Sequence, residues 1–394
     1  MMKVIARIKW IAVFALAIVV NAQNSAVVTA WNHLQHEELD KAREAIDKAI
    51  KHEQTKGKAK TWYYRAIIYG RISQNDKFKN LVPSPLDTAL TSYEKALDLD
   101  KKGTYTEEIR HELNMLIQYL YNQGVSAYNN QDFKSAYSSF VKANEAARIM
   151  AKAEGRTDFK GDTSLLEAAA IAAYNAQMID EAINAYEGVL KAGKQTAKIY
   201  NTLAYLYMVG KEDLEGAEKV IKEGREKFPT DIDLIRKQIN IYLIRGESEK
   251  ALPLIDEAIK KDSTDPMLFI IKGSIYEQQG NYDEAEKVYK KALALNDDLF
   301  DVNYSLGALY YNKAVEITEK MNALPVDKID EYNKLKEERD KWLKRALPYL
   351  EKAHKLKPDD LNTVAALREI YMRLGDTEKS KQMKELYEKL KNLQ

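Results

Sequence analysis

Small and aromatic residues recur at a fixed spacing in the central part of the chain. Within residues 266–299 they are Gly273, Tyr276, Gly280, Tyr282, Ala285, Tyr289 and Ala292. Spacings of three and four place such residues on one helix face, and a glycine between two such runs favours a turn. This stretch therefore predicts two short helices joined by a turn at Gly280.

The same pattern returns on both sides of this stretch with a constant period. Gly273 and Gly307 are 34 residues apart, and so are Ala251 and Ala285. A constant period of this length is the signature of tandem helix–turn–helix repeats. One helix pair cannot bury its apolar face alone, so neighbouring pairs have to stack and share a core.

This set of positions resembles the tetratricopeptide-repeat (TPR) family. Gly273 and Ala285 stand where two helices approach closely, and Tyr276 and Tyr289 fill the space beside them. The tryptophan that is usual in the first helix is kept only at Trp62. The resemblance implies an all-α, right-handed α-solenoid of about nine helix pairs. It also implies a protein that acts by binding a protein or an extended peptide in its concave groove, without catalysis or a cofactor.

The chain divides along this array at changes of spacing and composition. The predicted segments are a leader at 1–22, N-terminal pairs at 23–102, a third pair with long helices and a linker at 103–162, regular repeats at 163–299, an interrupted repeat at 300–358, and a last repeat with a capping helix at 359–394. The fifth pair carries one extra residue, which we place in the turn at 211–216.

The eighth pair contains an insertion. Gly307 and Ala346 are 39 residues apart, where the regular pair needs 12 between Gly273 and Ala285. Apolar residues keep a spacing of three and four through the insertion, which indicates helix on both sides of a turn at 322–327. We predict an antiparallel helical arm over about residues 313–345.

Composition narrows the class of partner. The chain has no cysteine, which excludes disulfides and thiolate metal sites. The formal net charge is +1, from 61 basic and 60 acidic residues. A nearly balanced surface gives no electrostatic reason to expect nucleic acid or an anionic membrane as a partner.

Residues 1–22 have the pattern of a secretory signal peptide. Lys3, Arg7 and Lys9 precede the apolar run 10–20, and small residues before Gln23 offer a cleavage site. We expect an exported protein, periplasmic or associated with the outer membrane, with no membrane span in the mature chain. A retained membrane anchor is the alternative.

Tyrosine is abundant, at 25 residues, and many tyrosines stand off the packing positions. In a TPR-like solenoid the first helix of each pair lines the concave face. Aromatic rings with a polar tip, mixed with amide and arginine side chains, suit recognition of a peptide or protein surface. The predicted partner-binding residues are Tyr63, Tyr121, Tyr128, Tyr174, Asn201, Tyr205, Arg236, Asn240, Tyr304, Tyr311 and Asn312.

The sequence offers little support for a metal site or for a clamp that holds a C-terminal carboxylate. His33, His36 and Glu37 lie close together, but no further ligand is spaced to complete a metal site. Arg236 and Asn240 resemble the start of the clamp with which some TPR adaptors hold a C-terminal carboxylate, but its other residues are missing.

Two further functions remain open as alternatives to a scaffold. One is a solenoid enzyme acting on glycans, for which Glu167 and Asp301 are the obvious inward acids. These two lie several repeats apart, whereas a catalytic pair of carboxylates has to stand within about 5–10 Å. The other alternative is self-assembly through the helical arm.

Overall fold

The computed structural model describes residues 26–392, and the predicted signal peptide lies outside this range. Over the described residues the regular structure is helical, in nine successive pairs, which confirms the predicted helical repeat fold. The chain forms two compact units, Met1–Val220 and Ile221–Gln394. The right-handed superhelix stays a prediction.

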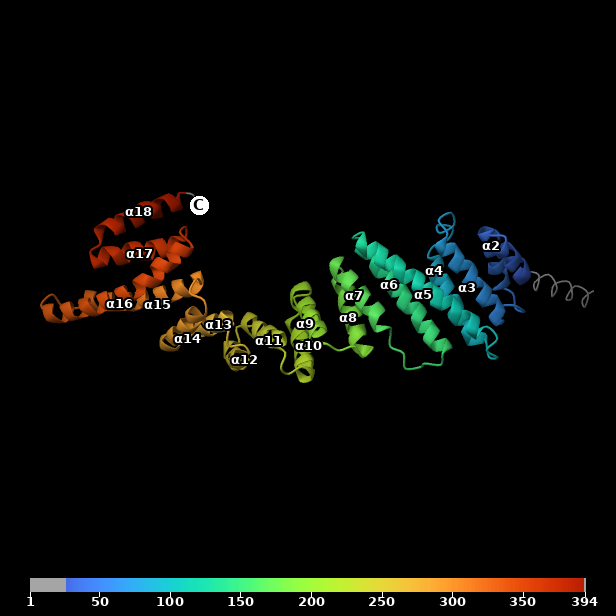
Figure 1. Cartoon of the computed structure of the whole chain (residues 1–394), viewed down its shortest axis with the longest axis horizontal. Coiled ribbons are helices and arrows are strands. Elements are labelled where there is room, and N and C mark those ends of the chain that lie inside the picture. The colour runs from blue at the N-terminus through green and yellow to red at the C-terminus, as the bar shows by residue number, and fades with distance from the viewer. Residues whose placement is uncertain (1–25, 393–394) are drawn as a thin grey trace, which may run out of the picture. The chain divides into compact units, whose positions relative to one another are not determined.

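The first unit contains four complete pairs and most of a fifth (Figure 1). A helix over residues 26–35 opens the unit. It is followed by α2 (Leu39–Ala49), α3 (Ala59–Gln74), α4 (Pro85–Leu99), α5 (Thr106–Asn129), α6 (Phe133–Ala153), α7 (Thr163–Asn175), α8 (Ile179–Lys191), α9 (Ala197–Tyr205), the π-helical turn η1 (Leu206–Gly210) and α10 (Leu214–Lys227). The long first helix predicted for the third pair is α5, with 24 residues.

The second unit begins within α10 and continues with four pairs. These are α11 (Ile232–Ile244), α12 (Ser248–Lys261), α13 (Pro266–Gln278), α14 (Tyr282–Leu295), α15 (Phe300–Asn322), α16 (Ile329–Leu356), α17 (Leu361–Leu374) and α18 (Thr377–Lys391). Asp265 and Asp360 accept hydrogen bonds from backbone N–H groups at the starts of α13 and α17, which fixes where these helices begin.

Close contact between the two helices of a pair depends on glycine. A Cβ atom on Gly273 would lie 2.4 Å from the ring of Tyr289, and one on Gly307 would lie 2.5 Å from the side chain of Leu350. Both partners are fully buried or nearly so. The role that the sequence assigns to Gly273 is therefore confirmed by the packing.

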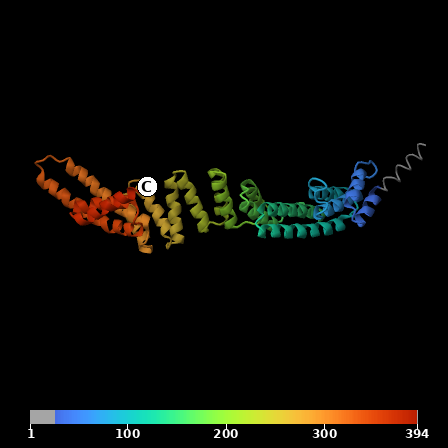
Figure 2. The same ribbon diagram turned by 90° about the horizontal axis from the view of Figure 1, so that it is seen from above.

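The predicted pair of long helices is present as α15, with 23 residues, and α16, with 28. The hairpin, orange in both views, extends past α17 and α18 (Figures 1 and 2). Most residues from 322 to 338 are exposed. Among them Val326 is 97% exposed and Ile329 is 64% exposed.

The extra residue of the fifth pair lies earlier than predicted. We expected it in the turn at 211–216, but the structure absorbs it in η1, where the N–H of Lys211 bonds to the carbonyl oxygen of Leu206. A hydrogen bond across five residues takes up one more residue per turn than the α-helical bond does. The period alone does not distinguish a longer turn from a widened helix.

Three tyrosines at one repeated position connect successive pairs by a hydrogen bond. Each lies in the first helical segment of its pair and donates its hydroxyl to a carboxylate on the second helix of the preceding pair. The bonds are Tyr69 to Asp47 at 2.7 Å, Tyr207 to Glu187 at 2.7 Å and Tyr371 to Glu351 at 2.6 Å. This bond gives the position a reason to hold tyrosine and not phenylalanine.

We expect Tyr207→Phe to lower the free energy of unfolding by about 1–2 kcal/mol, because it removes a hydrogen bond to a charged group. Burial and then the bond to Glu187 raise the pKa of Tyr207 from 10.0 to about 12. The unfolded phenol loses its proton before the folded one, so this contribution is complete below pH 10 and is lost by about pH 12. Urea unfolding from pH 7 to 12 measures both effects.

The matched control is Tyr137→Phe, since Tyr137 is a half-buried tyrosine of the same unit whose hydroxyl donates to no carboxylate of the described residues. It should change stability by less than about 0.5 kcal/mol. Equal losses for the two variants would contradict a special role of the bond between pairs.

Candidate functional site

Three neighbouring cavities in the first unit form one groove, which we call the α3–α5 groove. The first, of about 520 Å³, lies among the helix over 26–35, the start of α2, α3 and α5. Its lining residues are Trp31, Leu34, Gln35, Glu37, Leu39, Tyr63, Ile67, Arg71, Gln74, Asn75 and Glu112. This end of the groove therefore combines aromatic and aliphatic side chains with amide and charged ones.

The second cavity, of about 260 Å³, continues the first between α3 and α5. The two cavities share Ile67, Arg71, Gln74 and Glu112. Gly70, Tyr93, Met115, Leu116 and Tyr119 complete the second cavity. Gly70 lies inside α3, and a Cβ atom there would meet nothing within 4 Å.

The third cavity, of about 590 Å³, adjoins the second at Tyr119 and follows α5 to its C-terminal end. Its lining is polar and consists of Tyr119, Asn122, Gln123, Ser126, Ala127, Asn130, Asp132, Ser135 and Ser139. The positions 112, 115, 119, 122 and 126 are spaced by three and four, so one face of α5 lines the whole groove. The two long helices that carry this section, α5 and α6, run side by side (Figure 2).

Two opposite charges face the middle of the groove. Neither Arg71 nor Glu112 forms an ion pair or a side-chain hydrogen bond with any residue from 26 to 392. Burial raises the pKa of the Tyr93 phenol well above its usual value, with Glu112 adding to the rise and Arg71 opposing it. Burial, followed by Glu112, likewise raises the pKa of Tyr63 to about 12. Both charges therefore lie close to the phenols on the groove floor.

Amide side chains follow the groove from one end to the other. Gln35, Gln74, Asn122 and Asn130 are exposed. Their side chains make no hydrogen bond with the part of the chain that the structure describes. Each amide offers a donor and an acceptor, which is the pattern that a peptide main chain requires.

Six of the predicted partner-binding residues lie in the first unit, and among them Tyr63 lines the groove. Tyr63 is 9% exposed and packs against Tyr64 and Tyr105. Tyr121 is exposed and packs against Phe140. Asn201 and Tyr205 follow one another on a face of α9. The structure does not gather these residues in one place.

Tyr128 and Tyr174 do lie together, beside Tyr186. Both contribute to raising the pKa of Tyr186, after burial and Glu167. The hydroxyl of Tyr128 also accepts a hydrogen bond from Asn175 at 2.9 Å. These two tyrosines form a separate cluster that does not line the α3–α5 groove.

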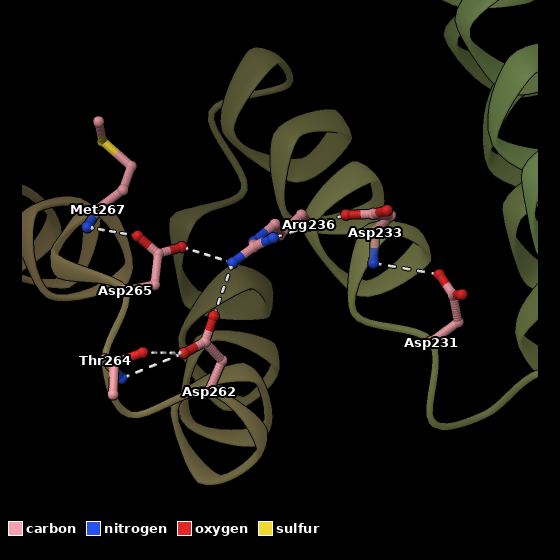
Figure 3. Close-up of polar contacts among 7 residues, drawn as sticks. All are labelled: Asp231, Asp233, Arg236, Asp262, Thr264, Asp265 and Met267. Atoms are coloured by element: carbon pink, nitrogen blue, oxygen red, sulfur yellow. Dashed lines mark hydrogen bonds and ion pairs between the residues drawn. The ribbon is translucent and has the colours of Figure 1, made fainter.

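Five predicted residues lie in the second unit, and Arg236 is held there by its own chain (Figure 3). Its guanidinium donates to Asp265 at 2.6 Å and to Asp262 at 3.2 Å, and it pairs with Asp233 at 3.5 Å. Asp265 also begins α13 by accepting from the N–H of Met267. Arg236 thus connects α11 to the turn before α13, a structural role that the sequence did not suggest.

The other four residues of the second unit lie on α11 and α15. Asn240 is exposed on α11, one turn after Arg236. Tyr304 is half-buried and stacks on Phe300, and Tyr311 and Asn312 follow two turns later on α15. Burial raises the pKa of both tyrosines, with Asp360 contributing at Tyr304 and Glu369 at Tyr311. A partner-binding role for these residues stays a prediction.

Sequence reasoning missed most of the groove, including Gly70, Arg71, Gln74, Glu112 and Tyr119. One available signal was Gly70, an extra glycine inside a predicted helix and off the packing positions. Another was the spacing of polar residues along α5. Counting from the start of an ordinary repeat gave Tyr121 and Tyr128, because α5 is longer than an ordinary first helix and shifts the register.

Three of the residues considered for metal binding and catalysis, His33, His36 and Glu167, have local partners. His33 contacts Glu38 at 2.5 Å, and His36 contacts the carbonyl oxygen of Asn32 at 2.7 Å. Glu167 pairs with Lys194. Within residues 26–392 no group of three or more His, Cys, Asp or Glu side chains could hold a metal ion. No described helix is both long and apolar enough to cross a membrane.

Residues 273–314, from α13 through α14 into α15, match the family model described as TPR repeat. This match supports the TPR repeat family. A curated relative, the TPR repeat-containing protein YpiA of Bacillus subtilis (strain 168), is 25% identical over 109 residues, which are 26% of this chain and 26% of that protein. The chain thus spans about a quarter of the length of this relative.

Solved structures of TPR proteins are also similar to this chain. YrrB, titled a TPR protein with an unusual peptide-binding site, is 17% identical over 45% of this chain and 86% of its own, with a TM-score of 0.35. MamA is 18% identical over 47% of this chain and 93% of its own, with a TM-score of 0.38. A TPR repeats protein from Bacteroides fragilis NCTC 9343 is 18% identical over 71% and 99%, with a TM-score of 0.28.

Proposed function

We propose that this chain is a non-catalytic scaffold of the cell envelope that binds an extended segment of a protein or peptide along its first helices. The observation that carries the proposal is the α3–α5 groove. Its three joined cavities have an end of mixed apolar and polar residues, a charged middle and an amide-lined end. Such a mixture of apolar surface and a few unpartnered polar groups is typical of a binding site.

The length and openness of the groove favour a peptide over a small molecule. A small ligand is usually enclosed in one pocket, whereas these cavities follow α5 from Glu112 to Asn130. At a rise of 1.5 Å per residue, those 18 steps extend over about 27 Å. An extended chain of about eight residues covers that distance.

Residues 1–22 are the reason for proposing a location in the cell envelope. Their basic start, short apolar run and small residues before Gln23 support export, either to the periplasm or to the outer membrane. Cleavage after Ala22 would release the repeats from the inner membrane. A retained anchor would place the same groove at the membrane surface.

Crosslinking in intact envelopes, followed by pull-down of the full chain, tests the function. We expect Gln74→Ala combined with Asn122→Ala to reduce capture of a crosslinked partner about tenfold, since each lost hydrogen bond costs about 0.5–1.5 kcal/mol. The matched control replaces Gln54 and Gln195, exposed amides that do not line the groove. Equal capture by both double variants, or no crosslinked partner at all, would refute the scaffold function.

Self-assembly through the arm is a second candidate, favoured by the exposed apolar residues at its tip. Val326 lies in the turn between α15 and α16, Ile329 begins α16, and Tyr332 follows within α16 at 44% exposed. If copies associate there, Val326→Asp with Ile329→Asp should convert an oligomer to a monomer in sedimentation velocity. A wild-type chain that sediments as a monomer would exclude this function.

A further inference from the structure

Close packing against a neighbouring side chain requires glycine at several other helical positions of this chain, but not at Gly70. A Cβ atom would clash with Phe140 at Gly124, with Tyr289 at Gly273 and with Leu350 at Gly307, but it would meet nothing at Gly70. A glycine inside a helix costs about 1 kcal/mol relative to alanine. The open space beside Gly70 is the middle cavity of the α3–α5 groove. A glycine at such a place allows the backbone of a ligand to approach closely.

Arg71 and Glu112 provide complementary hydrogen-bonding groups beside Gly70. Both line the first and the middle cavity of the groove, and neither has a hydrogen-bond or ion-pair partner among the described residues. A guanidinium only donates hydrogen bonds, and a carboxylate only accepts them. A main-chain peptide group carries one acceptor, its C=O, and one donor, its N–H.

The charges of the middle cavity disfavour a charged ligand side chain there. Its charged lining residues are Arg71 and Glu112, one of each sign. A cationic or anionic side chain at the centre would therefore meet a like charge together with an opposite one. A neutral peptide group can accept a hydrogen bond from Arg71 and donate one to Glu112 at the same time.

We propose that one peptide group of an extended polypeptide lies over Gly70, its C=O accepting from Arg71 and its N–H donating to Glu112. This inference rests on the proposed function and adds how the partner is recognised. The cavities continue on both sides of this point, so an interior part of the segment passes here and not a chain end. Recognition at this bond is independent of the partner's side chains.

The probe is a set of dodecapeptides selected from a random displayed library on the full chain. We expect Gly70→Leu to weaken their binding at least tenfold, because the new side chain occupies the middle cavity. Gly57→Leu is the matched control, since Gly57 also has nothing within 4 Å and does not line the groove. Circular dichroism and urea unfolding confirm that both variants fold.

Replacing each amide of a selected peptide by an ester, one at a time, locates the peptide group. An ester lacks the N–H, so one substitution should weaken binding to the wild-type chain about tenfold and have no such effect on Glu112→Ala. Arg71→Met should lower the affinity of every selected peptide, whatever its side chains.

Three results would overturn the inference: no dodecapeptide is selected, Gly70→Leu binds as well as Gly57→Leu, or no single ester has an effect that depends on Glu112. If a partner is still crosslinked in envelopes through the groove amides, the proposed function stands while this mode of recognition fails. If the chain captures neither an envelope partner nor a dodecapeptide, the proposed function and this mode of recognition both fail.

Discussion

Truncation of Tyr310 to alanine is expected to lower the free energy of unfolding of the Ile221–Gln394 unit by about 3–5 kcal/mol, the range for removing a large buried aromatic ring. Tyr310 is 1% exposed and lies 5.9 Å from the ring of Trp342 and 5.8 Å from that of Tyr349. The guanidinium of Arg345 lies over its ring at 4.4 Å. One truncation therefore opens a cavity between α15 and α16 and removes a cation–π contact.

Hydrogen exchange followed by mass spectrometry measures where Tyr310→Ala acts. In a repeat array each pair contacts only its neighbours, so protection should fall in α13 to α17 and stay unchanged in α3 to α6. The exposed Tyr332 of α16, replaced by alanine, is the control and should have little effect. A uniform loss of protection over both units would show that the chain unfolds as one cooperative body.

Leucine at Gly124 is expected to destabilise the first unit by about 3 kcal/mol, the upper part of the range for overpacking. A single Cβ atom at Gly124 would already lie 2.7 Å from the ring of Phe140, which is 3% exposed. Leucine at Gly70 should instead stabilise by about 0.5–1 kcal/mol, since it gains helix propensity and meets no neighbour. Thermal and urea unfolding of the two variants provide the comparison.

Gly70→Leu in α3 and Gly124→Leu in α5 should change the free energy of unfolding in opposite directions, which tests the packing directly. If Gly124→Leu is as stable as the wild type, the close contact between α5 and α6 is wrong. If Gly70→Leu is strongly destabilising, the space beside Gly70 is filled by other parts of the chain and the groove is not open there.

The helices could be predicted from the sequence because contacts in a repeat array are local. The 34-residue spacing from Gly273 to Gly307 gave the pairs, and the excess length after Gly307 gave the hairpin of α15 and α16. Both are properties of short stretches of chain. The widened turn at Leu206–Gly210 was missed, because an inserted residue lengthens the period equally in a loop or in a helix.

The candidate site was harder to predict because it depends on which helix faces meet. Tyr63 was predicted and lines the groove, whereas Arg71 and Glu112 stand 41 residues apart and come together only when α3 packs near α5. Arg236 looked available in the sequence, but its charge is matched by Asp233, Asp262 and Asp265. The availability of a charged side chain depends on its neighbours in space, which the spacing of the repeats does not specify.

Photocrosslinking from the groove tests the central claim most directly. In one variant a photoreactive amino acid replaces Met115, which lines the groove and is 44% exposed. In the control variant it replaces Ile171, which is 38% exposed on α7 and does not line the groove. With a dodecapeptide selected on the wild-type chain, we predict a covalent adduct from position 115 and none from position 171. Adducts from 171 alone, or equally from both positions, would contradict an extended segment bound along α5.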